Sequence, residues 1–360
     1  MPWEIGVGSP LTCIGDIVSA VDADGTASNG RGARHVNRGA QDFPDGRQAA
    51  AAVTERSQLG GVWCATLTPL EADGRPDHAR LAAHTQRLFA AGVDGIALFG
   101  TTGEGQSFSV AERLAGLEAL LDAGVDPARI IVGTACAALP ETVELTRHAV
   151  ACGCAGALVL PPFFFKGVSD DGVYASYARI IDTVADARLR LFLYHIPQAT
   201  GVPITDAVVA RIAKAYPTVL AGIKDSECNL EHSLRLLASF PNLAIFVGFE
   251  PHLPAARAAG GVGTICGIAN LYPRLIRRLF DRALDPAHRE DLARVERFIA
   301  ALEPFPLFAA FKALQAELTG DSAWNALRPP LVPLESPARK AWLAAAAASG
   351  IAESDAAALN

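Results

Sequence analysis

The sequence predicts a closed barrel of alternating strands and helices, a (β/α)8 or TIM barrel, with a C-terminal helical extension. From Gly61 onward, short apolar runs rich in β-branched residues recur about every 25–35 residues, with amphipathic segments of helical length between them. The runs are continuously apolar, which is typical of parallel strands covered by helices on both faces. Eight such units in about 225 residues match the number that closes a barrel. A doubly wound open sheet is the alternative, because the strand count decides whether the sheet closes.

The expected elements can be placed in order along the chain. The helix after the second strand begins beyond Ser109, because Ser109 and Glu112 have the spacing of a capping box. Pro140 suits the first turn of the next helix, where a backbone N–H is not needed. The predicted strands lie near residues 62–68, 94–99, 130–134, 156–161, 190–195, 219–224, 244–248 and 263–267.

Both ends of the chain differ from the barrel region, which we place at residues 58–284. Residues 1–57 are rich in small and polar residues without a helical or strand period, so we expect a flexible extension or a start codon assigned too early. A helical region is predicted over 285–348, followed by a tail over 349–360. The helical region is expected to contain helices at 286–302, 308–318 and 338–348, with a proline-rich break at 328–333 that cannot be helical throughout.

Composition excludes several classes of function. The 360 residues carry a formal net charge of -7 and no basic stripe, which argues against a nucleic-acid partner. No stretch of about 18 apolar residues predicts a membrane span, and the N-terminus lacks a secretory pattern, so a cytoplasmic protein is expected. The 7 cysteines form no regular framework, which indicates reduced thiols. Cys152 and Cys154 lack a second pair at metal-site spacing, and we predict no metal site.

Lys224 is the most informative residue. It is one of only five lysines, and it closes the apolar run 219–223, which is predicted to be a buried strand. Burial of an ammonium is costly and lowers a lysine pKa, and a neutral amine is a nucleophile for carbonyl groups. The alternative is a lysine whose charge reaches water beyond the strand end.

Other polar residues follow predicted strands at the edge where barrel active sites lie. The run from Gly100 to Gly103 combines glycines, which let backbone amides turn toward one point, with the hydroxyls of Thr101 and Thr102; this set suits a carboxylate. It is equally consistent with a tight turn whose threonines cap a helix. Tyr194 ends the fifth strand, where a phenol can relay a proton, although a lone tyrosine is more often a core aromatic.

Neighbouring strand residues point to opposite faces, so His195 beside Tyr194 is predicted to be structural. The glycine-containing segment 261–267 lacks the context of a dinucleotide loop. An amine, a phenol and an anion cradle together are what imine formation with a 2-oxo acid requires. No cofactor is needed for this chemistry.

Residues from about 61 to 335 resemble the dihydrodipicolinate synthase / N-acetylneuraminate lyase family of class I, Schiff-base aldolases. The matching motifs are GTTGEG at 100–105, YHIP at 194–197, GIKDS at 222–226 and GTICGIAN at 263–270. The resemblance implies a barrel with extra C-terminal helices that assembles as a homo-oligomer, a dimer or tetramer. It also implies that Lys224 forms the imine, that Tyr194 and Thr101 handle protons, and that Thr102 and neighbouring amides hold the carboxylate. Ile265, Phe164 and Ala199 are then expected to line the substrate site.

Two departures from the family pattern affect the expected substrate. Dihydrodipicolinate synthases carry an arginine two residues past the proline of the YxxP motif, where this chain has Ala199. They also carry a tyrosine pair after the fourth strand, and those positions correspond here to Phe163 and Phe164, in a loop that is one residue longer. Both losses weaken the assignment to condensation of pyruvate with aspartate semialdehyde.

The expected function is therefore that of a metal-free lyase on pyruvate or a longer 2-oxo acid. Aldol cleavage of a hydroxylated 2-oxo acid, such as a 2-keto-3-deoxy acid or 4-hydroxy-2-oxoglutarate, is favoured over dihydrodipicolinate synthesis, and dehydration within the same imine scheme stays open. A hypothesis of another class is a catalytically silent protein that binds 2-oxo acids.

Overall fold

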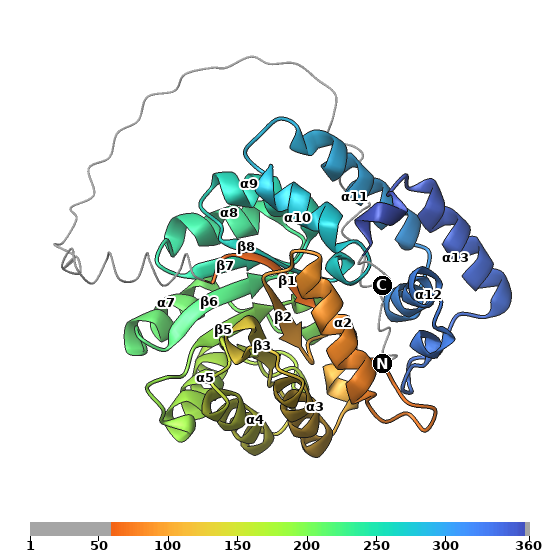
Figure 1. The fold of residues 1–360 in the computed structure, drawn as a ribbon. Helices are drawn as coiled ribbons and strands as arrows, with labels where there is room; N and C mark the ends of the chain where they lie inside the picture. The colour runs from red at the N-terminus through yellow and green to blue at the C-terminus, as the bar shows by residue number, and fades with distance from the viewer. Residues whose placement is uncertain (1–58, 357–360) are drawn as a thin grey trace, which may run out of the picture.

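The computed structural model describes residues 59–356, and these form a closed parallel barrel (Figure 1). Each strand pairs with the next in the chain, and the last pairs with the first, so the sheet has no edge. The strands are β1 (Gly61–Ala65), β2 (Gly95–Leu98), β3 (Ile130–Gly133), β4 (Gly156–Val159), β5 (Leu191–His195), β6 (Leu220–Asp225), β7 (Ala244–Val247) and β8 (Gly263–Cys266). The predicted fold class and all eight predicted strand positions are confirmed, and the open-sheet alternative is wrong.

Helices surround the strands (Figure 1). The expected capping box is present at Ser109, and Pro140 lies in the first turn of its helix. The helices are α2 (His78–Ala90), α3 (Val110–Asp122), α4 (Leu139–Ala151), α5 (Asp170–Val184), α6 (Pro197–Thr200), α7 (Asp206–Ala215), α8 (Leu230–Ser239), α9 (Leu253–Ala258), α10 (Pro273–Asp281), α11 (His288–Leu302), α12 (Leu307–Thr319) and α13 (Ser336–Ala348).

Two apolar layers hold the barrel together. One lies inside it, where Trp63 packs edge to face on Phe246 and Phe192 packs on the same ring at a tilt of 60°. Gly222 makes room for this layer, because a Cβ there would lie 2.1 Å from the Ala244 carbonyl oxygen. The other layer lies between the strands and the helices, and every strand except β6 is buried along its whole length. The strands are therefore apolar on both faces, as the sequence pattern predicts.

The C-terminal helices α11, α12 and α13 gather on one side of the barrel (Figure 1). Trp342 of α13 is fully buried, contacts the ring of Phe298 and donates a hydrogen bond to the Ala310 carbonyl at 2.7 Å. The end of the described chain is also attached, since the buried Asp355 carboxylate pairs with Arg278. The predicted break is confirmed, because residues 328–333 contain no helix. The predicted flexible extension, residues 1–57, lies outside the described residues.

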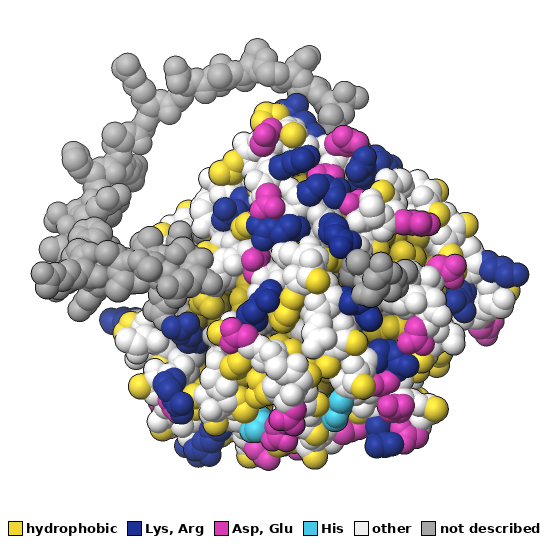
Figure 2. Space-filling view, viewed as in Figure 1, with side chains coloured by type: hydrophobic (Ala, Val, Ile, Leu, Met, Phe, Trp, Pro, Cys, Tyr) yellow, Lys and Arg dark blue, Asp and Glu magenta, His cyan; other side chains and the backbone are white. Residues whose placement is uncertain are grey.

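None of the helices within residues 59–356 is by itself long and apolar enough to cross a membrane. Only α11 and α12 taken together reach the required length and composition, and the chain bends by 116° between them. Figure 2 shows charges of both signs intermingled on one face of the molecule.

Candidate active site

Tyr194 and Lys224 are the second-to-last residues of two adjacent strands, and they lie opposite each other in the register of β5 and β6. The Lys224 ammonium nitrogen lies 4.2 Å from the centroid of the Tyr194 ring. Both residues are buried, each with 4% of its surface exposed. The strand pairing therefore places the predicted amine and the predicted phenol in direct contact, at the carboxyl end of the barrel.

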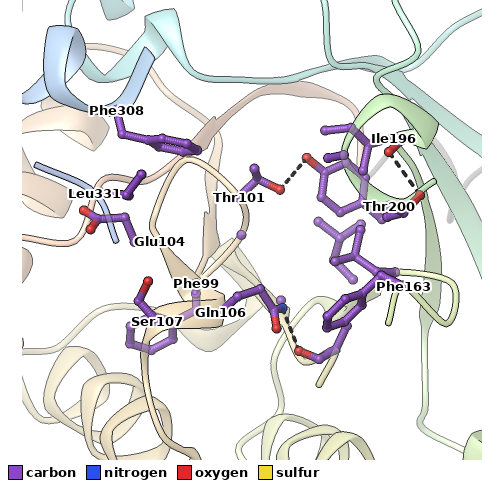
Figure 3. A pocket seen from close by; sticks show the side chains of 18 of the residues that line it. Phe99, Thr101, Glu104, Gln106, Ser107, Phe163, Ile196, Thr200, Phe308 and Leu331 are labelled. Carbon is purple, nitrogen blue, oxygen red and sulfur yellow. Dashed lines mark hydrogen bonds between the residues drawn. The ribbon is translucent and has the colours of Figure 1, made fainter. Parts of the chain in front are cut away.

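Thr101 joins this pair from the loop after β2. Its hydroxyl lies 3.1 Å from the Tyr194 phenol oxygen, within hydrogen-bond distance (Figure 3). Either hydroxyl can donate, so the bond can pass a proton in both directions. The sequence places these residues 93 positions apart, and the barrel brings them together.

The loop Gly100–Gly105 has the form of an anion cradle. It turns back on itself, since the Glu104 amide donates to Thr101 and the Gly105 amide donates to Gly100. Within residues 59–356, no hydrogen bond occupies the amides of Thr102 and Gly103. The chain runs close to β1 here, and a Cβ on Gly103 would lie 2.5 Å from the Thr66 carbonyl oxygen. Glycine is thus required where the loop is expected to offer its amides to a carboxylate.

A buried ion pair supports the cradle from the C-terminal helices. The Glu104 carboxylate lies 2.5 Å from the Lys312 ammonium of α12, and both side chains are almost fully buried. Lys312 also donates to the Ala326 carbonyl at 2.8 Å. Burial holds the pKa of Lys312 below its ordinary value, although the charge and hydrogen bond of Glu104 oppose this shift. The backbone of Glu104 is left-handed, with a φ of 55°, which is unfavourable for a residue with a side chain. The ion pair with Lys312 therefore helps to hold this conformation within the loop Gly100–Gly105.

Two cavities meet at these residues. The first, called the lysine cavity, has a volume of about 350 Å³ and contains Lys224, Thr102 and Ile265 in its lining. The second, called the side cavity, has a volume of about 360 Å³ and lies between the loops that follow β2 to β5. Both share a wall made of Thr101, Tyr194, Ile196, Ala199 and Phe308. Figure 3 shows Phe308 and Leu331 on one side of the side cavity, with Phe163 and Thr200 on the other.

Most predicted site residues fall on these cavities, with two exceptions. Gly100 lines the side cavity, and Ala199 lines both. Gly103 lies behind the cradle, where its carbonyl accepts a hydrogen bond from Thr68 at 2.7 Å. Phe164 is 70% exposed and lines neither cavity, whereas its neighbour Phe163 lines the side cavity. The role predicted for Phe164 in substrate binding therefore stays a prediction, because in this single chain the ring that reaches a cavity is that of Phe163.

Several residues of the lysine cavity were missed by the sequence analysis. Gln198, Ser226 and Glu250 are polar, and Phe308 and Phe311 come from α12. Glu250 is buried, accepts a hydrogen bond from the Ile268 amide at 3.1 Å, and has a pKa that burial raises above its usual range. Glu250 could have been found from the sequence, because it follows β7 at the carboxyl end of the barrel, where active sites lie. The α12 residues could not, because α12 lies outside the repeated strand–helix units of the barrel.

One cluster within the described residues has the composition of a metal site. The cluster consists of His195 at the end of β5, Asp225 at the end of β6, and Glu227 and His232 further along the chain; their ligand atoms lie within 4.8 Å of one another. The hydrogen bonds argue for a proton network instead. Nδ1 of His195 accepts from the Ile204 amide at 3.1 Å, so a neutral ring carries its proton on Nε2 and has no lone pair there for a metal. Nε2 faces Glu227 at 3.4 Å.

The same cluster supports the strand ends that carry Tyr194 and Lys224. Asp225 accepts hydrogen bonds from His232 at 3.0 Å and Ser233 at 2.6 Å. Burial raises the pKa of Asp225, but these bonds outweigh it and the net shift is downward. The pKa of His232 is raised because Asp225 outweighs its burial, while burial lowers that of His195. His195 is thus held within this buried network, which agrees with its predicted structural role.

Comparison with known proteins identifies relatives over most of the chain. Residues 58–349 match the model of the dihydrodipicolinate synthetase family. A protein of Chloroflexus aurantiacus named an uncharacterized DapA-like lyase is 38% identical over 77% of this chain and 92% of its own length. The 4-hydroxy-tetrahydrodipicolinate synthase of Synechococcus sp. strain CC9605 is 33% identical over 79% of this chain and 93% of its own length.

Solved structures show the same fold. Dihydrodipicolinate synthase from Agrobacterium tumefaciens is 33% identical and superimposes with a TM-score of 0.75, over 80% of this chain and 98% of its own. A 2-keto-3-deoxygluconate aldolase from Sulfolobus gives a TM-score of 0.72 at 22% identity, over 80% of this chain and 95% of its own. The second likeness concerns the fold alone.

Proposed function

The chain belongs to the dihydrodipicolinate synthetase family of class I lyases, and we propose that it cleaves or dehydrates a hydroxylated 2-oxo acid through an imine on Lys224. In this proposal the substrate carboxylate binds the cradle formed by Thr102 and the neighbouring amides. The 2-oxo carbon then faces the Lys224 amine. The contact between Lys224 and Tyr194 supports the assignment, because water must be expelled and a proton supplied where the imine forms.

The proton steps are assigned to Tyr194, with Thr101 as its partner. The amine adds to the ketone, and the resulting hydroxyl leaves as water with the phenol proton. The phenolate then removes the proton of the 4-hydroxyl, the bond between C3 and C4 breaks, and its electron pair neutralises the iminium as an enamine. Tyr194 returns the proton to C3, and water releases pyruvate. No oxidant or reductant is consumed in this scheme.

The observation that carries the choice of substrate class is the charge of the two cavities. Within residues 59–356, Lys224 is the single basic side chain that lines either cavity, and Ala199 leaves its position without charge. A second carboxylate, as in aspartate semialdehyde, would lose its hydration without gaining a cation. This favours a substrate with one carboxylate.

4-Hydroxy-tetrahydrodipicolinate synthesis is the second candidate. It is favoured by relatives of that name that are at least 30% identical over most of their length. A catalytically silent protein that binds 2-oxo acids is the third candidate.

A cytoplasmic location and a homo-oligomeric state, a dimer or tetramer, are also part of the proposal. The free thiols of the described cysteines are consistent with a reducing compartment.

Trapping the imine tests the function. We expect pyruvate and borohydride to add one reduced adduct per chain, on the peptide that contains Lys224. A Lys224→Arg variant keeps the charge but cannot form the imine, and it should remain unlabelled and inactive while melting normally. Labelling of Lys166 or Lys312 in place of Lys224 would overturn the assignment. An adduct on Lys224 without turnover of any hydroxylated 2-oxo acid would favour the silent binding protein.

A further inference from the structure

The aldehyde half of the substrate must occupy a definable part of the lysine cavity. With the carboxylate in the cradle after β2 and C2 on Lys224, the 4-hydroxyl has to reach the phenol of Tyr194. The group on C4, called the tail, then points toward the remaining wall. Much of that wall comes from the C-terminal helices and from the loop after β7.

This wall is apolar. It consists of Ile299 and Leu302 of α11, Leu307, Phe308 and Phe311 of α12, and Phe249 after β7. Ile299, Leu302 and Phe311 are buried, whereas Leu307 and Phe308 are half-buried and line the cavity from the first turn of α12. Six hydrocarbon side chains thus line the part of the lysine cavity that is left for a tail attached to C4.

Two polar side chains of the lysine cavity, Gln198 and Glu250, already bind backbone groups. Gln198 donates its amide to the Ser226 carbonyl at 2.5 Å, which orients that side chain along the loop. Glu250 receives the Ile268 amide and is buried. A polyhydroxylated tail would place several hydroxyls against hydrocarbon, and each unpaired hydroxyl costs about 1–3 kcal/mol. Among residues 59–356, no basic side chain besides Lys224, the lysine that holds the imine, lines this cavity to pair with a phosphorylated or carboxylated tail.

We propose that the aldehyde released or accepted by this site carries an apolar tail, aryl or branched alkyl, which rests on the wall formed by α11 and α12. The proposal rests on the proposed function and narrows its substrate class. The reaction is cleavage of a 4-hydroxy-2-oxo acid, R–CH(OH)–CH2–CO–COO⁻, into pyruvate and R–CHO, or the reverse addition. The bond that breaks joins C3 to C4, and the 4-hydroxyl proton ends on C3 of pyruvate, so that atoms and electrons balance.

The test is a panel of aldehydes offered with pyruvate to the full-length protein. Isobutyraldehyde and glyceraldehyde are of similar size and differ in hydroxyl content, while benzaldehyde, aspartate semialdehyde and glyceraldehyde 3-phosphate extend the comparison. We expect kcat/KM for isobutyraldehyde and benzaldehyde to exceed that for the other three by about tenfold or more, since one apolar group in a fitting pocket discriminates by about that factor.

Two leucines provide a matched pair of variants. Leu307 lines the lysine cavity alone, Leu331 lines the side cavity alone, and both are half-buried. Leu307→Ser should reduce kcat/KM for benzaldehyde about tenfold and that for glyceraldehyde little. Leu331→Ser should leave the ratio of the two unchanged. Imine trapping with pyruvate should be normal in both variants, and a thermal melt confirms that each is folded.

The outcomes separate this proposal from the function on which it rests. Absence of a pyruvate adduct on Lys224 would contradict the proposed function itself. A normal adduct with faster turnover of glyceraldehyde, its phosphate or aspartate semialdehyde would overturn the apolar tail alone. Loss of benzaldehyde preference in Leu331→Ser, with Leu307→Ser unaffected, would also overturn the proposal, because the tail would then occupy the side cavity.

Discussion

At the scale of single residues, we expect the side chain at position 199 to influence which substrate is preferred. Ala199 lines both cavities and lies on the short helix α6, which follows β5, the strand that carries Tyr194. An arginine here would project a planar guanidinium toward the tail of the substrate. Such a group binds a carboxylate through two parallel hydrogen bonds.

We therefore predict that Ala199→Arg reverses the aldehyde ranking. The kcat/KM for aspartate semialdehyde should rise about tenfold or more, and that for benzaldehyde should fall, because a charge displaces part of the apolar contact. Ala199→Met is the control for side-chain size, and it should not favour the semialdehyde. Steady-state kinetics with pyruvate in excess measure both values. Efficient condensation by the unmodified protein would show that another group already holds the second carboxylate.

At the scale of elements, the loop after β2 depends on α12 through Glu104 and Lys312. Lys312→Met leaves the Glu104 carboxylate buried without its cation, and breaking a buried pair in this way typically costs about 3–5 kcal/mol. We expect that loss in the free energy of unfolding by urea, together with weaker pyruvate binding as the cradle loosens. The double variant Glu104→Gln with Lys312→Met should recover much of the stability. Additive losses in the double variant would show that the two side chains are not coupled.

The network beside β5 and β6 gives stability a pH dependence. The raised pKa of His232 means that the folded protein holds this proton more tightly than the unfolded chain does. Its contribution is complete below the ordinary histidine pKa of about 6.5 and is lost as the pH rises through the folded value. The carboxylate of Asp225, whose pKa is lowered, keeps its contribution until the solution becomes acidic.

This predicts how a His232→Asn variant behaves across pH. The melting temperature of the unmodified protein should exceed that of the variant most near pH 6, and the difference should shrink between pH 7 and 9. Burial lowers the pKa of His195, so this residue makes the folded protein less stable as the pH falls below about 6.5. That opposing slope is present in both proteins and should therefore cancel in the difference between their melting temperatures. A difference that stays constant from pH 6 to 9 would mean that His232 does not titrate with the fold.

At the scale of the whole molecule, the barrel is complete without residues 1–57. Strand β1 begins at Gly61 and pairs with both β2 and β8, and Leu59 is fixed by a hydrogen bond from the Trp63 indole to its carbonyl. We predict that deletion of residues 1–57 shifts the melting temperature by less than about 2 °C, which corresponds to less than about 1 kcal/mol for a domain of this size. Activity should also be retained. A larger shift would move the domain boundary toward the N-terminus.

The sequence by itself determined the barrel, its strand positions and the core of the site. Continuous apolar runs at regular spacing specify parallel strands, and short polar motifs at their carboxyl ends specify where chemistry lies. Because the period of a strand is two, the sequence also indicated that Tyr194 and His195 face opposite ways. Lys224, Tyr194 and Thr101 could be found for these reasons, since each lies on or directly after a regular element.

Tertiary structure alone decided what surrounds that core. Lys312 reaches Glu104, and Phe308 and Leu307 reach the lysine cavity, because α12 folds back against the barrel across about two hundred residues of chain. No local pattern encodes such a contact. The packing of the loop after β4 likewise places Phe163 on the side cavity and leaves Phe164 exposed, since two adjacent rings in an irregular loop have no fixed alternation. The predicted catalytic residues follow local rules, whereas the walls of the two cavities depend on packing between distant segments.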